Sequence, residues 1–430
     1  MIYRDIERVI SSKSKIDDRI TPDYKEYCLS NIPSTIMNHF QVNNNRQSLP
    51  DETFKDELDG SENIILLLVD GLGYKNWLKH HKNTRFLKKL SEKGSTTPLT
   101  SVFPSTTSAS LNTLNSGLTP QEHGLPEWFV YFQEIDMTLQ SLRLQTVEGI
   151  DVGDFEIDNV DSNILFKDET IYEKLEKNGI PSYTLAREAL IDNPYQRLTL
   201  KGSKRLPYQN LDDLFNKIRT LTETQKGPTF IYAYIDSLDA VGHVCGPSSI
   251  EYADELEKID CAVINGLISK ISRKNASDTC IIVTADHGMI DIPANSTMYL
   301  NSLPEFQSML RESSNMGYIA PTGSPRDVYL HLKKDSVDDC FHYLSEELVG
   351  FADVFRVKEA IELGLYGVGR PCDEFLDRVG DLLLLPRENW TLWYQVFPAK
   401  LYEKAGVHGG LSKEEMLIPF GVSKLSELLN

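Results

Sequence analysis

The chain has 430 residues, of which 40% are hydrophobic and 25% charged, and it carries a formal net charge of −19 at pH 7. This composition is typical of a soluble globular protein that is large enough for more than one domain. The negative charge argues against long nucleic acid or an anionic membrane as a partner, since both require dense Lys and Arg patches, but it does not exclude a small anionic substrate.

Residues 1–62 are expected to form an N-terminal segment that packs on the core, with a helix over residues 24–40. Residues 1–20 are charged throughout and lack the apolar stretch of a secretory signal. The longest apolar run, residues 64–69, is far too short to cross a bilayer. Six cysteines without paired spacing are expected to be reduced thiols. The expected location is therefore the cytoplasm.

Residues 63–290 alternate between apolar runs and helical stretches, which predicts an α/β core with a mainly parallel central sheet flanked by helices. Three of the runs are typical of buried strands: residues 63–69, 230–235 and 280–285. Each ends at, or shortly before, an Asp or a His. Because ligands bind at the carboxyl ends of the strands in such sheets, we expect one site assembled from distant parts of the chain.

Seven dispersed residues have the chemistry of a metal site: Asp70, Thr107, Asp239, His243, Asp286, His287 and His408. Three carboxylates and three imidazoles are too many for one tetrahedral zinc, but they suit two ions that share a site. Paired ions of this kind clamp the attacking and leaving oxygens of a displacement at phosphorus. Asp239 and His243 are four residues apart, so one helical turn would place both on the same face.

Two segments do not follow the alternation of strands and helices that is expected for the core. Residues 127–154 alternate Phe, Tyr, Leu and Val with polar residues and predict hairpins. Residues 291–400 are too many for a single βα unit and carry their own pattern, with strands at 327–332 and 381–385 and a helix over 337–348. This pattern predicts a small α/β cap inserted into the core, to which residues 401–430 return with the last metal ligand.

The order of five motifs resembles the alkaline phosphatase superfamily, and within it the type I phosphodiesterase / nucleotide pyrophosphatase family. The motifs are Asp70-Gly71, Ser105-Thr106-Thr107, Asp239-x-x-Gly-His243, Asp286-His287-Gly288 and Val407-His408-Gly409-Gly410. The resemblance implies that one ion is held by Asp70, Thr107, Asp286 and His287, and the other by Asp239, His243 and His408. It implies zinc as the metal, with manganese able to substitute.

The same resemblance implies a hydrolase of phosphodiester or pyrophosphate bonds that acts on small phosphodiesters, nucleotides or nucleotide conjugates. Thr107 would be the nucleophile and would pass through a phosphothreonine intermediate. His123, in a His-Gly pair that the family does not use as a ligand, is expected to be a buried structural imidazole.

One stretch departs from the family pattern. Nucleotide pyrophosphatases typically follow the nucleophile with Phe-Pro-Asn-His, whose ring stacks on the base and whose amide supports the phosphate oxygen. This chain has Ser108-Ala109-Ser110-Leu111, so Ser110 stands where the amide would be. Asn112 would be turned about 200° away on a helix. Trp128, Phe129 and Tyr131 are the candidate replacements for the stacking ring, with core or hairpin packing as the alternative. Of the three, Trp128 is the predicted substrate-binding residue. Weaker discrimination among nucleotides is expected.

Other functions fit the same residues. A phosphomonoesterase, phosphonate hydrolase or phosphomutase would share the core, although a monoesterase needs an extra cation for the second free oxygen. Arg326, Arg370 and Arg378 in the cap are the candidates for that cation. A non-catalytic metal- or nucleotide-binding regulatory protein would use the same fold, but the complete ligand set disfavours it. The sequence leaves the oligomeric state open.

Overall fold

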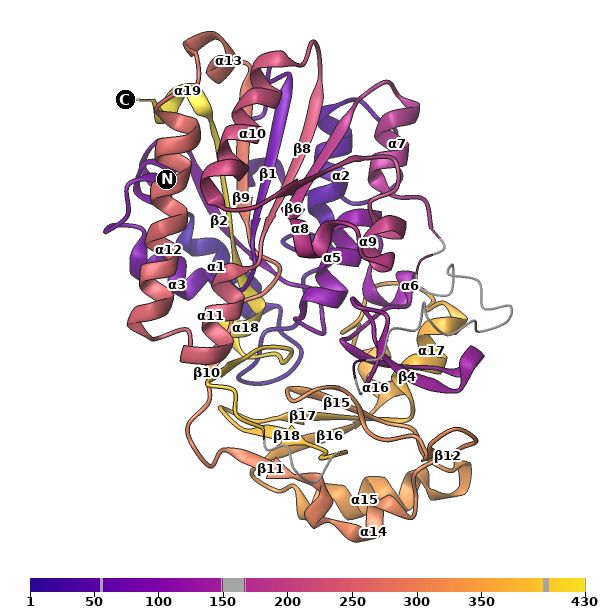
Figure 1. The fold of residues 1–430 in the computed structure, drawn as a ribbon. Helices are drawn as coiled ribbons and strands as arrows, with labels where there is room; N and C mark the ends of the chain where they lie inside the picture. Colours follow the sequence, from indigo (N-terminus) through magenta and orange to yellow (C-terminus); the bar gives the residue numbers. More distant parts are fainter. Residues whose placement is uncertain (55–56, 148, 150–165, 167, 397–401, 430) are drawn as a thin grey trace.

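The protein was analysed as a computed structural model, which describes residues 1–54, 57–147, 149, 166, 168–396 and 402–429. Its largest element is a seven-stranded sheet in the order β2-β20-β9-β1-β8-β6-β7 (Figure 1). The strands are β1 (Asn63–Val69), β2 (Ser95–Thr100), β6 (Ser182–Arg187), β7 (Lys204–Tyr208), β8 (Thr229–Ile235), β9 (Thr279–Thr284) and β20 (Leu417–Lys424). β20 runs antiparallel to β2 and β9, and every other pair of neighbouring strands in this sheet is parallel. The prediction of a mainly parallel α/β sheet is confirmed.

The central strands are apolar because helices cover both of their faces. Every residue of β1 is buried, and Leu66 lies in register between Tyr232 of β8 and Ile282 of β9. Helices α4 (Phe86–Lys93), α10 (Leu211–Thr224) and α12 (Ile250–Val263) form one layer. Helices α2 (Ile32–His39), α5 (Thr107–Ser116) and α7 (Ile171–Lys177) form the other (Figure 1). In the part of the chain that is described, no helix is both long and apolar enough to span a membrane.

The N-terminal segment differs from its prediction. Instead of one helix over residues 24–40, the structure has a 3-10 turn at Leu29–Asn31 followed by α2. Pro33 lies in the first turn of α2, where its missing N–H costs nothing, and a proline ring at that position disfavours a helix that continues from upstream. Helix α2 packs against α5 and α7.

A second seven-stranded sheet lies below the first in Figure 1, in the order β16-β17-β15-β14-β3-β4-β5. Four strands come from the predicted cap: β14 (Thr322–Ser324), β15 (Asp327–Leu330), β16 (Ala352–Arg356) and β17 (Leu382–Pro386). The other three are hairpin strands: β3 (Phe129–Phe132), β4 (Met137–Gln140) and β5 (Gln145–Thr146). Gly323 pairs with Phe129 and so joins the two segments. Helix α15 (Val337–Glu347) lies within two residues of its predicted range.

A buried ion pair ties the second sheet to the first. Arg326, just before β15, donates from Nε and Nη2 to the two carboxylate oxygens of Glu415, at 3.0 and 2.8 Å. Both side chains are almost fully buried. Glu415 lies in α18 (Lys413–Met416), directly before β20, and its carbonyl accepts the N–H of Gly288 at 2.8 Å. The pair therefore also supports the loop that carries Asp286 and His287.

We expect Glu415→Gln to lower the free energy of unfolding by about 3–5 kcal/mol, because it leaves the Arg326 guanidinium buried without a counter-charge. Glu414→Gln is the matched control, since Glu414 pairs with Lys75 at 3.0 Å on the surface and such pairs contribute only about 0–1 kcal/mol. Urea denaturation of both variants measures the difference. Equal destabilisation by the two substitutions would contradict the role given to the buried pair.

Candidate metal centre

Four predicted site residues converge at the carboxyl edge of the main sheet, where β1 and β9 end. Nε2 of His287 lies 3.4 Å from Oδ1 of Asp70 and 3.2 Å from Oδ2 of Asp286. Oγ1 of Thr107 lies 3.1 Å from the same nitrogen. Asp70, Asp286 and His287 are buried, whereas Thr107 is partly exposed. One small volume is therefore surrounded by two carboxylates, an imidazole and a hydroxyl.

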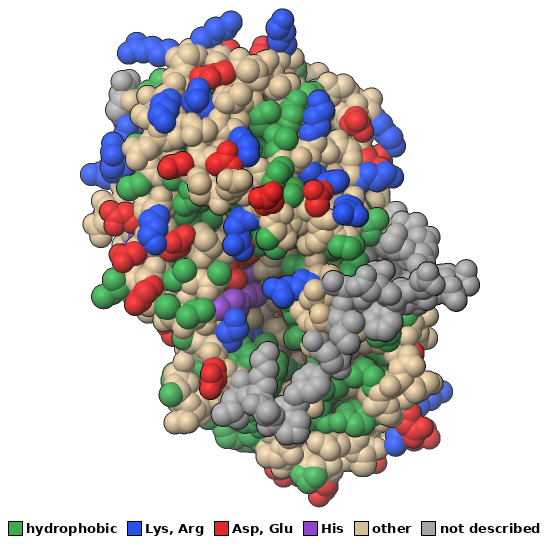
Figure 2. All heavy atoms as spheres, in the orientation of Figure 1, with side chains coloured by type: hydrophobic (Ala, Val, Ile, Leu, Met, Phe, Trp, Pro, Cys, Tyr) green, Lys and Arg blue, Asp and Glu red, His purple; other side chains and the backbone are tan. Residues whose placement is uncertain are grey.

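The other three predicted ligands form a second group beside the first. Asp239 and His243 share one face of α11 (Ser237–Cys245), which follows β8, with Oδ2 and Nε2 3.4 Å apart. Nε2 of His408, just after β19 (Gly406–Val407), lies 3.7 Å from Oδ1 of Asp239. The rings of His287 and His408 stack with centroids 3.6 Å apart, so the two groups adjoin. Figure 2 shows histidine side chains in the hollow between the upper and lower parts of the molecule.

Each of the three imidazoles is oriented by a backbone carbonyl. Nδ1 of His243 lies 2.8 Å from the carbonyl oxygen of Gly406. Nδ1 of His287 lies 3.0 Å from that of Gly288, and Nδ1 of His408 lies 3.1 Å from that of Ser105. A carbonyl only accepts hydrogen bonds, so Nδ1 carries the proton and the lone pair lies on Nε2. In all three residues this is the nitrogen that faces the carboxylates, which is the arrangement that metal-binding histidines adopt.

Each of the three carboxylates has an oxygen that lacks a hydrogen-bond partner and to which a cation could bind. Among the described residues, Oδ1 of Asp70, Oδ1 of Asp239 and Oδ2 of Asp286 are buried without a hydrogen-bond partner. The pKa of Asp70 is raised well above its usual range by burial and by the nearby charges of Asp286 and Asp239. A cation bound between the carboxylates would offset this unfavourable interaction.

Within each triad the candidate ligand atoms lie within 4.8 Å of one another. The residues present therefore fit two divalent ions, one held by Asp70, Asp286 and His287 and the other by Asp239, His243 and His408.

Thr107 is the first residue of α5, whose N-terminus faces the metal centre. The first-turn N–H groups of a helix have no partner inside the helix, and the helix dipole favours an anion there. Thr106 is the N-cap residue, and its side chain makes no capping hydrogen bond. The geometry thus places a hydroxyl, a set of free amide donors and a carboxylate–imidazole cluster around one point, which is a combination suited to a phosphoryl group.

The three predicted substrate-binding residues make other contacts. Ser110 is fully buried and donates to the carbonyl of Asp286 at 3.0 Å, so it supports the metal-site loop. Nδ2 of Asn112 donates to the carbonyl of Ser108 at 2.9 Å, within α5. Trp128 is half-buried, with the guanidinium of Arg143 5.6 Å from its ring centroid. These contacts indicate structural roles for Ser110 and Asn112.

Tyr234 was missed by the sequence analysis. Its hydroxyl donates to Oδ2 of Asp70 and fixes the carboxylate that lies opposite His287. A signal for it was present, because a tyrosine in a fully buried strand such as β8 needs a polar partner for its hydroxyl.

His123 is the buried structural residue that was expected. Its Nδ1 accepts the N–H of Leu125 at 3.1 Å, and its Nε2 lies 3.3 Å from Oγ1 of Thr113. Burial lowers the pKa of His123 to about 3, so the ring is neutral in the folded protein at neutral pH.

A pH dependence follows from this pKa. The unfolded chain takes up a proton on His123 near pH 6.5 whereas the folded protein does not, so this contribution to stability is present above pH 6.5 and is lost as the pH falls towards 3. Between pH 6.5 and 4.5 we expect the wild type to lose about 2–3 kcal/mol more than His123→Asn, which keeps an acceptor near Nδ1 but does not titrate. Denaturation of both proteins at several pH values measures the difference, and parallel curves would contradict the assignment.

We expect the purified protein to bind two divalent ions per chain after dialysis against zinc. His408→Ala should bind about one, because Asp70, Asp286 and His287 remain together while the second group keeps only Asp239 and His243. His123→Asn, which lies outside both groups, should still bind two. Atomic absorption on the dialysed proteins measures the stoichiometry. Two ions in His408→Ala, or none in the wild type, would contradict the division into two groups.

Comparison with known proteins places this site in a family context. The type I phosphodiesterase / nucleotide pyrophosphatase profile matches residues 64–411. Venom phosphodiesterase 2 of Crotalus adamanteus is 23% identical over 244 residues, which cover 55% of this chain and 28% of the venom protein. An uncharacterized pyrophosphatase/phosphodiesterase of Schizosaccharomyces pombe is 23% identical over 373 residues, which cover 80% of this chain and 67% of that protein. The chain thus spans little more than a quarter of the venom enzyme.

Solved structures with a similar fold include murine ectonucleotide pyrophosphatase/phosphodiesterase 5, with a TM-score of 0.63 at 18% identity over 85% of this chain and 92% of the other. Phosphonoacetate hydrolase from Sinorhizobium meliloti has a TM-score of 0.59 at 17% identity over 85% of this chain and 94% of the other. At such identities these two likenesses show the fold alone. The profile, however, covers both metal groups and Thr107, and the chain belongs to the type I phosphodiesterase / nucleotide pyrophosphatase family.

Proposed function

We propose that the protein hydrolyses phosphodiester or pyrophosphate bonds in small molecules, with Thr107 as the nucleophile and two divalent ions in the site. The main support is the convergence of Oγ1 of Thr107, Oδ1 of Asp70 and Oδ2 of Asp286 within 3.1–3.4 Å of Nε2 of His287. Nucleotides and their conjugates are the proposed substrates. The family and the structure of the murine relative in complex with AMP support this choice.

The proposed reaction gives a role to Thr107, to the bound ions and to the first residues of α5. Bound divalent ions would lower the pKa of a coordinated hydroxyl and offset the charge on the phosphoryl oxygens. Oγ1 of Thr107 attacks phosphorus in line with the leaving oxygen, so the new phosphorus–oxygen bond forms as the bond to the leaving group breaks. The N–H groups at the start of α5 donate to the phosphoryl oxygens. Water then attacks the phosphothreonine and releases Thr107 for another turnover.

Zinc is the proposed metal. Imidazole nitrogens and carboxylate oxygens are its usual ligands in catalytic sites, and three Nε2 atoms are presented here together with three carboxylates. Manganese is bound more weakly by the same donors but can replace zinc where it is abundant.

A diester is favoured over a monoester by the positions of the three cap arginines. Arg326 is paired with Glu415, and Nη1 of Arg378 donates to the carbonyl of Gly124 at 2.6 Å. Arg370 is 89% exposed, with Asp373 3.6 Å away. Two of the three are thus held by buried partners and the third lies on the surface, so these arginines do not provide the extra cation that the second free oxygen of a monoester requires.

We expect Thr107→Ala to lower the turnover of bis(4-nitrophenyl) phosphate at least about 10³-fold, because it removes the nucleophile. Both ions should stay bound, because Asp70, Asp286 and His287 would still hold the ion next to Thr107. Thr107→Ser should keep part of the activity, since it retains the hydroxyl and loses only the methyl group that restricts its rotamer. Release of 4-nitrophenol and metal content are the two measurements. Thr106→Ala is the control for the position of the nucleophile, and if it were inactive while Thr107→Ala stayed active, the nucleophile would be Thr106.

A further inference from the structure

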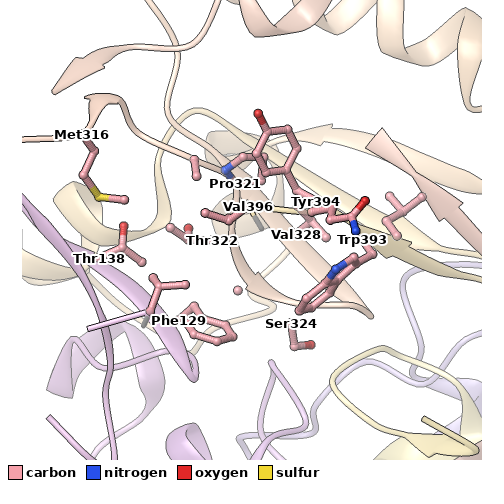
Figure 3. A pocket seen from close by; sticks show the side chains of 15 residues that line it. Phe129, Thr138, Met316, Pro321, Thr322, Ser324, Val328, Trp393, Tyr394 and Val396 are labelled. Carbon is pink, nitrogen blue, oxygen red and sulfur yellow. The ribbon is translucent and has the colours of Figure 1, made fainter. Parts of the chain in front are cut away.

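The two faces of the second sheet differ in polarity. One face packs on α15, and there Phe129 and Val328 border a mainly apolar pocket of about 130 Å³ (Figure 3). Consecutive residues of a strand point to opposite faces, so Asp327 and Tyr329 of β15 lie on the other face. Tyr329 packs there in the hydrophobic core of the main sheet. The face that meets the main sheet therefore carries the buried carboxyl group of Asp327.

A second carboxyl group meets that of Asp327. It belongs to Glu127, which comes shortly before β3, and the two residues are 1% and 0% exposed. Their side chains lie within hydrogen-bonding reach of each other. Oε2 of Glu127 accepts the N–H of Trp128, and Oδ1 of Asp327 accepts the hydroxyl of Ser324. Among the described residues, Oε1 of Glu127 and Oδ2 of Asp327 have no partner. Carboxylate oxygens only accept hydrogen bonds, so neither oxygen can satisfy the other.

The hydroxyl of Thr106 lies at the same place. Thr106 is 2% exposed, and its Oγ1 has no hydrogen-bond partner among the described residues. A threonine at an N-cap usually caps its helix through this oxygen, but Thr106 makes no capping hydrogen bond to α5. Burial raises the pKa of Glu127 to about 7, and the nearby hydroxyl of Thr106 is among the groups that partly offset this. Three unpartnered oxygens are thus gathered in one buried place.

The neighbouring guanidinium of Arg326 does not balance the charge of these carboxyl groups. Its Nε and Nη2 are bound to Glu415, and its Nη1 donates to the carbonyl of Trp390 at 2.5 Å. Burial and the charge of Glu127, with a smaller contribution from Glu415, raise the pKa of Asp327 well above its usual range. Such a pair requires a shared proton or a bound cation. A shared proton joins only two oxygens, whereas a cation can contact all three.

The three oxygens adjoin two loops of the metal centre without belonging to either candidate ion group. Thr106 directly precedes the proposed nucleophile. On the other side, a Cβ on Gly409 would lie 2.5 Å from Oγ of Ser324 and 2.7 Å from Oδ1 of Asp327. Gly409 is the residue after His408. An ion held by the three oxygens would therefore fasten the hairpin and the cap beside both loops.

We propose that Glu127, Asp327 and Thr106 bind a third cation, a hard divalent ion of the Ca²⁺ or Mg²⁺ type. All three donors are oxygens, which hard cations prefer, whereas zinc sites usually contain nitrogen or sulfur. A divalent charge balances two carboxylates and leaves the Thr106 hydroxyl as a neutral ligand. Water and backbone carbonyls are the usual further ligands of such ions. The site is independent of the proposed hydrolysis, because binding of the ion requires no turnover.

Calorimetric titration of the zinc-loaded protein with CaCl₂, and separately with MgCl₂, tests the site. We expect one of the two cations to bind at one ion per chain in addition to the two zinc ions, and to raise the melting temperature. Glu127→Gln and Asp327→Asn keep the side-chain shapes and each remove one negative charge. Each should weaken binding of the third ion at least about 10-fold, with the zinc content unchanged.

Asp381→Asn is the matched control for these two variants. Asp381 is a cap carboxylate that directly precedes β17, and its Oδ2 accepts the N–H of Leu332 at 2.8 Å, outside the proposed site. The control should bind the third ion as the wild type does. Absence of a third ion from the wild type, or equal affinity in Asp381→Asn and the two site variants, would overturn the proposal.

Thr106→Val removes only the hydroxyl and should weaken the third ion about 5-fold. Its control is Thr96→Val, because Thr96 of β2 is also buried with an unpartnered Oγ1 but lies in the main sheet. Equal affinity in the two variants would remove Thr106 from the site. A protonated carboxyl band in the infrared spectrum that is lost in Glu127→Gln, without uptake of Ca²⁺ or Mg²⁺, would assign the pair to a shared proton and overturn the cation. Failure of the proposed function would be seen separately, as absence of diester hydrolysis.

Discussion

Three carboxylates gathered in one site repel one another, and the structure around them is organised to keep them together. Asp70 follows β1, Asp286 closely follows β9 and Asp239 lies in the first turns of the helix after β8. These strands are neighbours in the order β9-β1-β8 and run parallel, so their carboxyl ends reach the same edge of the sheet. Bound cations would offset the energetic cost of gathering these charges, while the rest of the fold supplies the apolar packing.

Glycines at this edge of the sheet determine how closely the candidate ligands approach one another. A Cβ on Gly288 would lie 2.0 Å from the carbonyl oxygen of Glu414, so the chain after His287 passes directly against α18. Gly71 has a φ of +73°, and a Cβ there would lie 3.2 Å from Cβ of Asp239. Its N–H donates to Oδ1 of Asp286 at 3.1 Å. Backbone packing and carboxylate orientation are therefore coupled, and a side chain at either glycine would displace a ligand.

The sequence analysis was most accurate where an apolar run is followed closely by a residue that can bind a metal. The strands that precede Asp70 and Asp286 were predicted within one residue, because uninterrupted apolar runs have few alternatives in an α/β fold. The pairing of Phe129 with Gly323 was not predicted, since contacts between strands so far apart in the chain leave no periodic signal in either segment. The role of Ser110 was likewise hidden, because a serine is equally able to face a substrate or to hold a buried carbonyl.

The division of roles between the two sheets follows from these contacts. The candidate ligands and Thr107 lie at the edge of the main sheet, whereas the second sheet meets them with Ser324, Arg326 and Asp327, which surround Gly409. The sequence analysis sought the missing stacking ring among Trp128, Phe129 and Tyr131, but Tyr131 packs edge-on against His331, and Phe129 lies in register with Gly323 of the cap. Because the hairpin and the cap are joined through the pairing of Phe129 with Gly323, either segment can change while the strands that carry Asp70 and Asp286 stay the same.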